Sequence, residues 1–585
     1  MRLRGRDRSG AVGSALPRAH RREEFALSVE LNREKSEQGG ALGEDGLKIP
    51  VRGEEALARA VLEAGATFAT GYPGSPGPGV IEHIHRLSWA VDAEVRWAPS
   101  PRSAFEWARG ASLAGRLATV CLSGQGFAGI YSSLVAAART GVGRGLLVIV
   151  GDDPGAWDSF AELDSRVLAA AAEVPVFEPA SIPEAAAMVG EAYGISRSYD
   201  VPVVIRITTG FAEEEGTLTE GAAVLPGGSP SGPVDSLGGE RLSLPLSATL
   251  NHERLHARLD HLRHASRFSR FVEPLGEGKK GVVAVGHAFT KLAQVLGQVP
   301  VEQLRILRVG QVFPPPDYQL LEFALASEAV LVLEEGEPFV EQSLRTLLSE
   351  HVQKPKVYGK LFGPVAREGE LQRWHIEEVL RGFEPKLELG RPFFPLAEKR
   401  DRPSTAPVCL GCWLTEVFSA FREVLNEVDL PVEPLIVGDH GCALHFAHRP
   451  WRAVDVLPAP GSALGVAMGM LSAQPERRVV VVTGDYSFAD SSVADLLEAS
   501  VRQLPLTLVL LDNGVSGYTG GQPRSAGNLV ALEDLVGTAR PALLRVVAEG
   551  DTERFRAALG EALTADGLAV VVVKVHCLLA ELEEE

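Results

Sequence analysis

Short apolar runs alternate with amphipathic stretches along most of the chain. An apolar run of about four to eight residues between turn residues fits a buried strand, whereas apolar spacing near 3.6 residues fits a helix. In the first part of the chain, this pattern predicts helices over 54–64 and 102–114 and strands over 67–71, 118–122 and 145–150. Because strands that alternate with helices form parallel sheets, residues 46–212 are predicted to be an α/β domain.

The same alternation returns twice further along the chain. Strands are expected over 281–285, 304–309 and 329–333, and again over 434–437, 479–483, 506–511 and 569–575. These stretches predict two more α/β domains, over 280–390 and 408–580. The segment 213–279 is rich in Gly, Ser, Pro, His and Arg and is interpreted as a linker or small helical insert, and 391–407 as a second linker.

Composition and charge narrow the function classes. The 585 residues include 57 Lys and Arg against 76 Asp and Glu, which gives a net charge of −19. This balance argues against nucleic acid, whose phosphates are met by cationic surfaces. No apolar run approaches the roughly 18 residues that span a bilayer, so no membrane association is expected. Residues 1–45 are predicted to be a disordered tail and 581–585 an acidic tail.

Polar residues follow two predicted strands of the last domain. Gly484 and Asp485 end one strand, and Asp512 and Asn513 end the next, with a helix between them. Ligands of parallel sheets bind at the carboxyl ends of the strands, and Mg²⁺ prefers carboxylate, amide and phosphate oxygens. Each dipeptide alone is an ordinary strand-to-turn sequence. Together they predict that Asp485 and Asn513 bind one ion.

This pairing resembles the signature of thiamine diphosphate enzymes, and the wider sequence resembles one family of them. The chain is similar, from about residue 53 to residue 579, to the large subunit of indolepyruvate:ferredoxin oxidoreductase, within the 2-oxoacid:ferredoxin oxidoreductase family. The segments that carry the resemblance are Gly71-Tyr72-Pro73-Gly74-Ser75-Pro76, Asp152-Asp153-Pro154-Gly155, Glu334-Glu335-Gly336-Glu337-Pro338, Cys409-Leu410-Gly411-Cys412, Gly438-Asp439-His440-Gly441-Cys442 and 484–523.

The resemblance implies a thiamine-diphosphate-binding fold. Its first domain would hold the aminopyrimidine, its last the diphosphate, and a transketolase-C-terminal-like domain would lie between them. The side chains of Asp485 and Asn513 and the carbonyl of Val515 would bind Mg²⁺. The resemblance also places Gly438, Asp439 and Gly484 against the cofactor, where glycine lets the backbone approach phosphates.

Five cysteines are too few for a disulfide framework, and no secretory signal precedes the first domain, so a reducing cytoplasm is expected. Cys121 lies in an apolar strand and is interpreted as core. The other four, Cys409, Cys412, Cys442 and Cys577, resemble the ligands of the family's 4Fe-4S cluster. Zinc on the same sulfurs, a redox pair and buried thiols remain alternatives.

The region that would activate the cofactor departs from the family. Most thiamine diphosphate enzymes use a glutamate against the aminopyrimidine, and the resemblance places Pro101 at that position. Glu106 lies five residues further on, so it faces differently on a helix. The loops at 123–125 and 158–161 also differ from the family's pattern. The cofactor's diphosphate side is therefore expected to be kept and its pyrimidine side altered.

The resemblance implies oxidative decarboxylation of a 2-oxoacid, an arylpyruvate such as indolepyruvate, with electrons passed to the iron-sulfur cluster and the acyl group to coenzyme A. Ser75 and His440 are the candidate catalytic residues, although serine in a Gly/Pro turn is more often structural and loop histidines are usually solvated. Two alternatives stay open. One is a non-oxidative thiamine diphosphate decarboxylase or lyase, and the other is a catalytically impaired cofactor-binding subunit.

The same resemblance implies partners. A small subunit of the oxidoreductase and a ferredoxin-like electron acceptor are expected, since no pair of CxxCxxCxxxCP runs follows Cys577 in the sequence. Thiamine diphosphate sites often lie between chains, so a homodimer or heterotetramer is expected.

Overall fold

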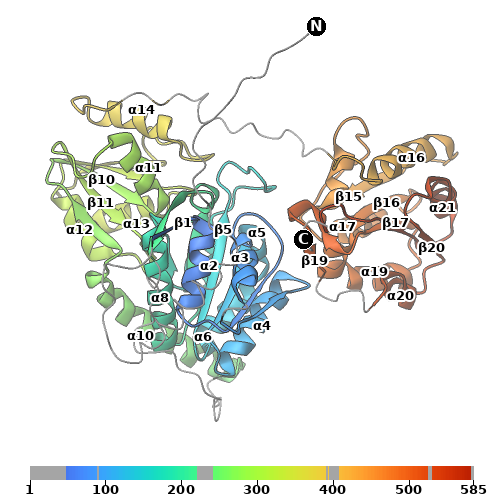
Figure 1. Cartoon of the computed structure of the whole chain (residues 1–585), viewed down its shortest axis with the longest axis horizontal. Coiled ribbons are helices and arrows are strands. Elements are labelled where there is room, and N and C mark those ends of the chain that lie inside the picture. The colour runs from blue at the N-terminus through green and yellow to red at the C-terminus, as the bar shows by residue number, and fades with distance from the viewer. Residues whose placement is uncertain are drawn as a thin grey trace, which may run out of the picture.

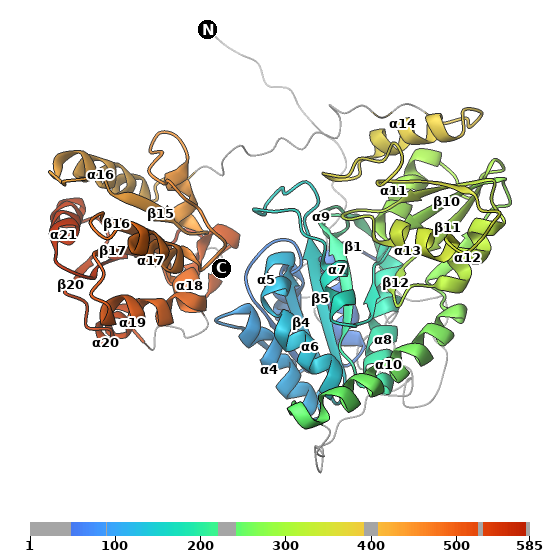
Figure 2. The ribbon, with the colours of Figure 1, turned by 180° about the vertical axis from the view of Figure 1, so that it is seen from behind.

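The computed structural model describes residues 48–88, 91–219, 241–390, 393, 408–524 and 530–580 (Figures 1 and 2). The expected tails over 1–45 and 581–585 lie outside the described residues, as does the expected linker over 391–407 apart from Phe393. The predicted α/β class with parallel sheets is confirmed.

The first domain is built on a seven-stranded sheet in the order β12-β6-β7-β5-β4-β2-β3, parallel except for β12. Apolar clusters cover both of its faces, which explains why its strands are continuous apolar runs. Its strands are β2 (Phe68–Gly71), β3 (Glu94–Trp97), β4 (Ala118–Ser123), β5 (Leu146–Asp152), β6 (Val176–Phe177) and β7 (Val203–Thr208). Its helices are α2 (Gly53–Glu63), α3 (Gly79–Leu87), α4 (Pro101–Leu113), α5 (Gly124–Gly129), α6 (Tyr131–Thr140), α7 (Ser165–Ala171), α8 (Ile182–Tyr199) and α9 (Thr209–Ala212).

The middle domain has a five-stranded sheet in the order β14-β13-β10-β11-β9, in which only β9 is antiparallel among the described strands. Its strands are β9 (Val272–Leu275), β10 (Lys280–Val285), β11 (Leu304–Val309), β13 (Ala329–Leu333) and β14 (Lys356–Tyr358). Its helices are α11 (His287–Leu296), α12 (Asp317–Leu325), α13 (Phe339–Leu348) and α14 (Arg373–Phe383).

The segment 213–279, predicted as a linker or insert, carries elements that belong to both neighbouring domains. Strand β8 (Glu215–Thr219) pairs with β1 (Lys48–Arg52), and β9 completes the middle sheet. Between them, helix α10 (Ala248–Ala265) lies along α6. In the opposite direction, β12 (Gln311–Phe313) leaves the middle domain and pairs with β6 of the first sheet. These exchanges, and one apolar cluster with residues from both domains, join the two into one body.

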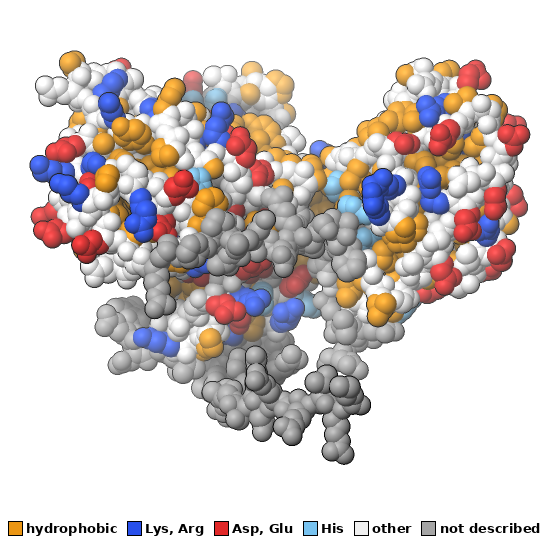
Figure 3. All heavy atoms as spheres, turned by 90° about the horizontal axis from the view of Figure 1, so that it is seen from above, with side chains coloured by type: hydrophobic (Ala, Val, Ile, Leu, Met, Phe, Trp, Pro, Cys, Tyr) orange, Lys and Arg blue, Asp and Glu red, His pale blue; other side chains and the backbone are white. Residues whose placement is uncertain are grey.

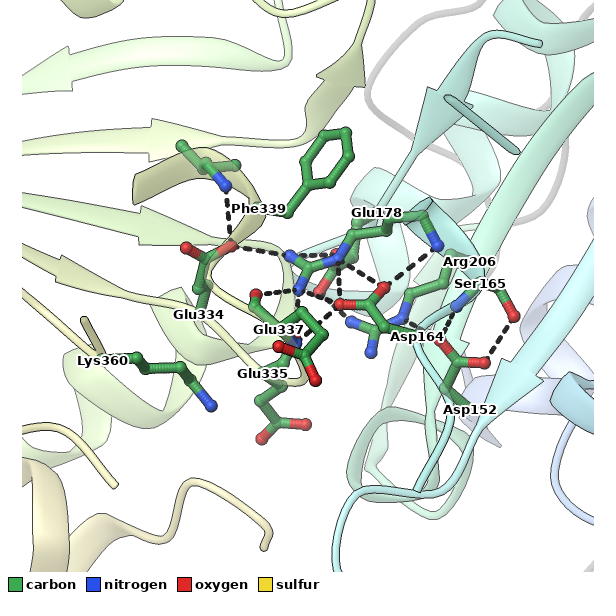
Figure 4. Close-up of polar contacts among 12 residues, drawn as sticks. Asp152, Asp164, Ser165, Glu178, Arg206, Glu334, Glu335, Glu337, Phe339 and Lys360 are labelled. Atoms are coloured by element: carbon green, nitrogen blue, oxygen red, sulfur yellow. Dashed lines mark hydrogen bonds and ion pairs between the residues drawn. The ribbon is translucent and has the colours of Figure 1, made fainter. Parts of the chain in front are cut away.

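A buried ionic network also crosses the boundary between these two domains (Figure 4). Arg166 contacts Asp164 and Glu334, with nitrogen to oxygen distances of 2.6 and 3.0 Å, and all three side chains are almost fully buried. Glu178 lies between Arg166 and Arg206 and contacts both. Glu334 belongs to the middle domain, so the Arg166 guanidinium ties the two domains together.

Replacing Arg166 with methionine is expected to lower the free energy of unfolding by about 3–5 kcal/mol. Methionine keeps the bulk but leaves Asp164 and Glu334 buried without their cation, which costs more than the ion pair itself contributes. Urea unfolding followed by tryptophan fluorescence measures the change. The matched control is Arg502→Met, which removes an exposed ion pair with Glu498 and is expected to cost at most about 0.5 kcal/mol. Equal shifts in the two variants would contradict the network's role.

The last domain has a five-stranded parallel sheet in the order β15-β16-β17-β21-β20 with its own apolar clusters. Its strands are β15 (Leu435–Gly438), β16 (Val479–Gly484), β17 (Leu506–Asp512), β20 (Leu543–Val547) and β21 (Ala569–Lys574), and a small ribbon pairs β18 (Val515–Ser516) with β19 (Gln522–Pro523). Its helices are α16 (Leu414–Glu427), α17 (Ala463–Ala473), α18 (Asp485–Ser487), α19 (Val493–Val501), α20 (Leu532–Thr538) and α21 (Thr552–Thr564).

The last domain meets the first at a few side chains. Gln522 in β19 donates a hydrogen bond to Glu82 in α3, and the rings of Tyr72 and Tyr486 lie 6.1 Å apart. Seen from above, acidic and basic side chains are interspersed on both parts (Figure 3). Among the described helices, none is both long and apolar enough to cross a membrane.

Candidate active site

The candidate site lies where β16 and β17 end side by side. Gly484 is paired in register with Leu511, so Asp485 and Asn513 follow neighbouring strands at one edge of the sheet. A Cβ added to Gly484 would meet no atom within 4 Å. The backbone at the end of β16 is therefore open to a ligand, as a phosphate-binding edge requires.

The Asp485 carboxylate, the Asn513 amide and the Val515 carbonyl converge at this edge. The side-chain oxygen of Asn513 lies 3.1 Å from Asp485 Oδ1 and 2.7 Å from the carbonyl oxygen of Val515. Exchanging the nitrogen and oxygen of the amide would turn both contacts into hydrogen bonds, and a cation between the three oxygens would relieve them as well. A carboxylate, an amide oxygen and a carbonyl form the donor set that Mg²⁺ takes. The residues present fit a magnesium ion.

The pKa values of the acidic side chains at this edge also favour a bound cation. Burial raises the pKa of Asp485 to about 7; the nearby charge of Asp512 adds to the rise, and Arg524 opposes it. Burial also raises the pKa of Asp490 to about 6, and the charge of Asp439 adds to that rise. The ionised forms of these two carboxylates are disfavoured although Arg524 and Arg102 lie nearby, and a divalent ion would supply additional positive charge.

Asp439, expected against the cofactor, uses its carboxylate within the protein. Oδ1 accepts hydrogen bonds from the backbone N–H groups of His440 and Gly461 at 2.8 and 2.9 Å, and Oδ2 accepts one from the Thr483 hydroxyl at 2.9 Å. Gly438 ends β15 directly before it. Asp439 therefore fixes the loop that follows β15, and its contact with the cofactor stays a prediction.

The two candidate catalytic residues lie on loops of different domains, Ser75 in the first domain and His440 in the last. Nε2 of His440 lies 2.9 Å from the Pro458 carbonyl, its ring centroid lies 5.0 Å from that of Phe160 in the first domain, and burial lowers its pKa. His440 is therefore a neutral imidazole with Nε2 donating. Ser75 lies in the β2–α3 loop, which also carries Tyr72. Their catalytic roles stay predictions.

The four cysteines predicted to bind a cluster gather beside this edge. The sulfurs of Cys442 and Cys577 each lie 3.2 Å from the point that a Cβ on Gly517 would occupy. Burial raises the pKa of Cys442 to about 12, and the charges of Cys577, Cys412 and Cys409 add to the rise, in that order. All four thiols are therefore electrostatic neighbours, although they come from three distant parts of the chain.

The spacing of these sulfurs bears on which metal they suit. Zinc holds four sulfurs at about 2.3 Å, which places them about 3.8 Å from one another. In the described part of the chain, no three cysteine sulfurs lie within 4.8 Å of one another. The four sulfurs are therefore not arranged as in a four-sulfur zinc site, and the cluster stays a prediction. Cys121, interpreted as core, lies fully buried in β4.

One contact links the cysteines to the oxygen site. The amide nitrogen of Asn513 donates a weak hydrogen bond to Cys442 Sγ at 3.9 Å. On the other side of the array, Cys409 is exposed and the next residue, Leu410, is 99% exposed. The cysteine array thus extends from the candidate metal site to the protein surface.

The first turn of α4, where the resemblance places the activating glutamate at Pro101, contains no carboxylate. Pro101 is the first residue of this helix, and the N-cap is Ser100, which accepts a hydrogen bond from Ser103 N–H. Glu106 lies in the second turn, is 42% exposed and contacts Arg109 at 3.5 Å. Asp490 of the last domain interacts electrostatically with Arg102, beside the start of α4.

Four residues of the site were not predicted: Tyr72, Tyr486, Asp490 and Arg524. Tyr72 is partly buried next to Tyr486 of the last domain; burial raises its pKa, and the nearby charges of Asp490 and Tyr486 add to the rise. Arg524 lies 3.6 Å from Asp485 Oδ2. Tyr486 and Asp490 fall inside the 484–523 segment and Tyr72 inside the 71–76 segment, so their positions in those motifs were a usable signal. Arg524 lies one residue beyond the segment and carried no such signal.

Two known family models match the first and last domains of this chain. Residues 59–220 match the thiamine diphosphate-binding domain of pyruvate flavodoxin/ferredoxin oxidoreductases, and residues 437–573 match the C-terminal thiamine-pyrophosphate-binding domain of thiamine pyrophosphate enzymes. The two matched ranges contain the β2 and β16 ends that line the site.

Individual relatives cover nearly the whole chain. Indolepyruvate oxidoreductase subunit IorA of Methanothermobacter thermautotrophicus is 27% identical over 92% of this chain and 88% of that protein. IorA of Archaeoglobus fulgidus is 26% identical over 92% of this chain and 87% of that protein. A solved 2-oxoglutarate:ferredoxin oxidoreductase from Magnetococcus marinus superposes on 59% of this chain and 66% of that chain, with a TM-score of 0.47 and 16% identity.

Proposed function

Since the chain belongs to the thiamine-diphosphate-dependent 2-oxoacid:ferredoxin oxidoreductase family, we propose that it is the large subunit of an enzyme that oxidatively decarboxylates an arylpyruvate such as indolepyruvate. The IorA relatives support the choice of substrate. Coenzyme A would receive the acyl group, a ferredoxin-like protein the electrons, and a small subunit would complete the enzyme.

The chain's own residues would hold the cofactors in defined places. Asp485, Asn513 and the Val515 carbonyl would bind Mg²⁺, and the open backbone at Gly484 would receive the diphosphate. Bound thiamine diphosphate supplies the carbanion chemistry of decarboxylation, which no side chain provides. Ser75 and His440 would face the substrate from opposite domains, and because Nε2 of His440 donates to the Pro458 carbonyl, the neutral ring would present Nδ1 as a hydrogen-bond acceptor.

One observation carries the oxidative part of this proposal. The array of Cys409, Cys412, Cys442 and Cys577 begins beside Asn513 and ends at the surface. A 4Fe-4S cluster on these sulfurs would therefore lie between the cofactor and an external acceptor. A non-oxidative decarboxylase would need no such array. A catalytically impaired subunit is favoured by Pro101 alone.

The proposal is tested by cluster reduction under anaerobic conditions. Protein with its small subunit, thiamine diphosphate, Mg²⁺ and a loaded cluster is mixed with indolepyruvate and coenzyme A, and visible absorbance and CO₂ are followed. Reduction of the cluster together with CO₂ release is expected, and neither should occur when thiamine diphosphate is omitted. CO₂ without reduction would indicate a non-oxidative decarboxylase. Neither signal from indolepyruvate, pyruvate or 2-oxoglutarate, with cofactor bound, would indicate an impaired subunit.

Introducing a carboxylate at the family's position is expected to speed proton exchange at C2 of bound thiamine diphosphate. Pro101→Glu places an acid in the first turn of α4, which a helix N-terminus favours, so the variant should fold. General acid–base catalysis typically contributes about a hundredfold or more, and an increase of that order is expected. Pro101→Gln, which has the same shape without the charge, is the control. Equal exchange rates in the two variants, measured by NMR after acid quench, would contradict this role for the position.

A further inference from the structure

A second candidate metal site lies far from the cysteine array, between α10 and the end of α7. His252 and His256 are four residues apart on α10, so both imidazoles project from one face of the helix. Their ring centroids lie 4.2 Å apart. Nε2 of His252 lies 2.6 Å from one carboxylate oxygen of Glu173, and Nε2 of His256 lies 2.6 Å from the other.

The backbone of Glu173 is unusual for its residue type. Glu173 follows the C-terminus of α7 with a φ of +60°, in the left-handed region. Helices commonly end with glycine in this conformation, because a side chain there costs about 1–2 kcal/mol. Gln503 and Arg540 take the same conformation after other helices, so only the contacts of the Glu173 carboxylate indicate a site; it faces both histidines and lies 3.3 Å from Arg139.

We propose that Glu173, His252 and His256 form a zinc site that fastens α10 to the first domain. One ligand atom from each residue lies within 4.8 Å of the other two. Zinc binds imidazole nitrogens at about 2.0–2.1 Å and carboxylate oxygens at about 2.0–2.2 Å, so tetrahedral ligands lie about 3.3 Å apart. The present 2.6 Å contacts would open by less than about 1 Å, which side-chain torsions allow because both rings are partly exposed.

The chemistry of the three ligands selects the ion. Two imidazoles and one carboxylate are a common zinc set, whereas Mg²⁺ and Ca²⁺ prefer oxygen alone. The exposed side of the site leaves a coordination position for water. Arg139, beside the carboxylate, would orient it in the way that outer-sphere partners of metal ligands do.

The proposed zinc site would stabilise the packing of α10 against the first domain. Of the 18 residues in this helix, only Asn251, Leu255 and Leu262 are buried. Much of its other contact with the first domain is polar, including bonds from Arg258 to the carbonyls of Tyr199, Asp200 and Ala138. A helix with so little apolar contact gains from a metal cross-link. Because α10 leads into β9, the cross-link would also steady the junction with the middle domain.

The test measures zinc itself on cluster-loaded protein that has been freed of loosely bound metal. Titration calorimetry with Zn²⁺ should show one site in the wild type, at least about a hundredfold weaker in His256→Ala. His261→Ala, which removes an exposed histidine from the same helix, should leave the site unchanged. Zinc should raise the melting temperature of the wild type and of His261→Ala, but not that of His256→Ala.

Glu173→Gly provides the variant that separates binding from folding. Glycine suits a φ of +60°, so the metal-free variant should melt no more than a few degrees below the wild type and still lose the zinc-dependent rise in melting temperature. Equal zinc stoichiometry and equal zinc-induced stabilisation in the wild type, Glu173→Gly and His256→Ala would overturn the proposal. Iron content measured on the same samples ensures that the cysteines are occupied.

Discussion

Asp485→Asn is expected to weaken the binding of thiamine diphosphate with Mg²⁺ by at least about a hundredfold and to abolish 2-oxoacid oxidation. Asparagine keeps the shape of the side chain but removes the charge from the three-oxygen site shared with Asn513 and Val515. Equilibrium dialysis with thiamine diphosphate and Mg²⁺ measures the affinity, and cluster reduction measures the activity.

The same variant should not lose stability when metal is absent. The folded-state pKa of Asp485 is raised to about 7 by burial, so the charged carboxylate disfavours the folded state above that pH. The penalty is present at pH 8 and falls away as the pH drops below 7. Metal-free Asp485→Asn should therefore melt at or above the wild-type temperature at pH 8. Asp534→Asn, which changes an exposed acid of the same domain, is the control for affinity. Comparable binding of thiamine diphosphate and Mg²⁺ by the wild type and by Asp485→Asn would refute the metal site.

Cys442→Ala is expected to remove the iron-sulfur cluster and to abolish electron transfer while thiamine diphosphate still binds. Cys442 accepts the weak hydrogen bond from Asn513, and a cubane cluster needs a thiolate at each of its four corners. Iron content, visible absorbance and the electron paramagnetic resonance spectrum of the reduced protein measure the loss.

Cys121→Ala is the matched control for the cysteine prediction. It removes a sulfur of the same chemistry from the fully buried strand β4, so it should cost stability and leave iron content unchanged. The reverse pattern, with iron kept in Cys442→Ala, would contradict the cluster. Zinc in place of iron in anaerobically prepared wild type would contradict it as well.

Much of the fold was predictable from local pattern. The strand ends that carry Gly484 and Asn513 follow long apolar runs, and such runs are strong signals. Strand β12 was not predictable, because it is three residues long and pairs with β6 more than 130 positions earlier. In the connector 213–279, a small helical insert was one of the two expectations. The bounds of α10 and the presence of β9 were not predicted, because the apolar signal of this segment is weak.

The candidate site, like the fold, was predictable from the sequence only in part. Asp485, Asn513 and the cysteines belong to motifs, so their proximity could be predicted from the sequence, whereas their metal-binding roles stay predictions. The surroundings of Asp439 could not be predicted from the sequence, because the hydrogen-bond donors named above come from three separate segments. Glu173 and His252 lie on two elements that are about 80 residues apart in the sequence. Sequence spacing therefore could not predict that their side chains meet.

Proton exchange at C2 of bound thiamine diphosphate tests the enzymatic role of the chain most directly, because it requires no knowledge of the substrate. The anaerobic holoprotein with Mg²⁺ is placed in deuterium oxide, quenched with acid at set times and analysed by NMR, with binding verified in the same samples. Exchange much faster than in free thiamine diphosphate is expected if this site activates its cofactor despite Pro101. Exchange no faster than in the free cofactor, with the cofactor bound, would contradict an enzymatic role and leave a cofactor-binding subunit.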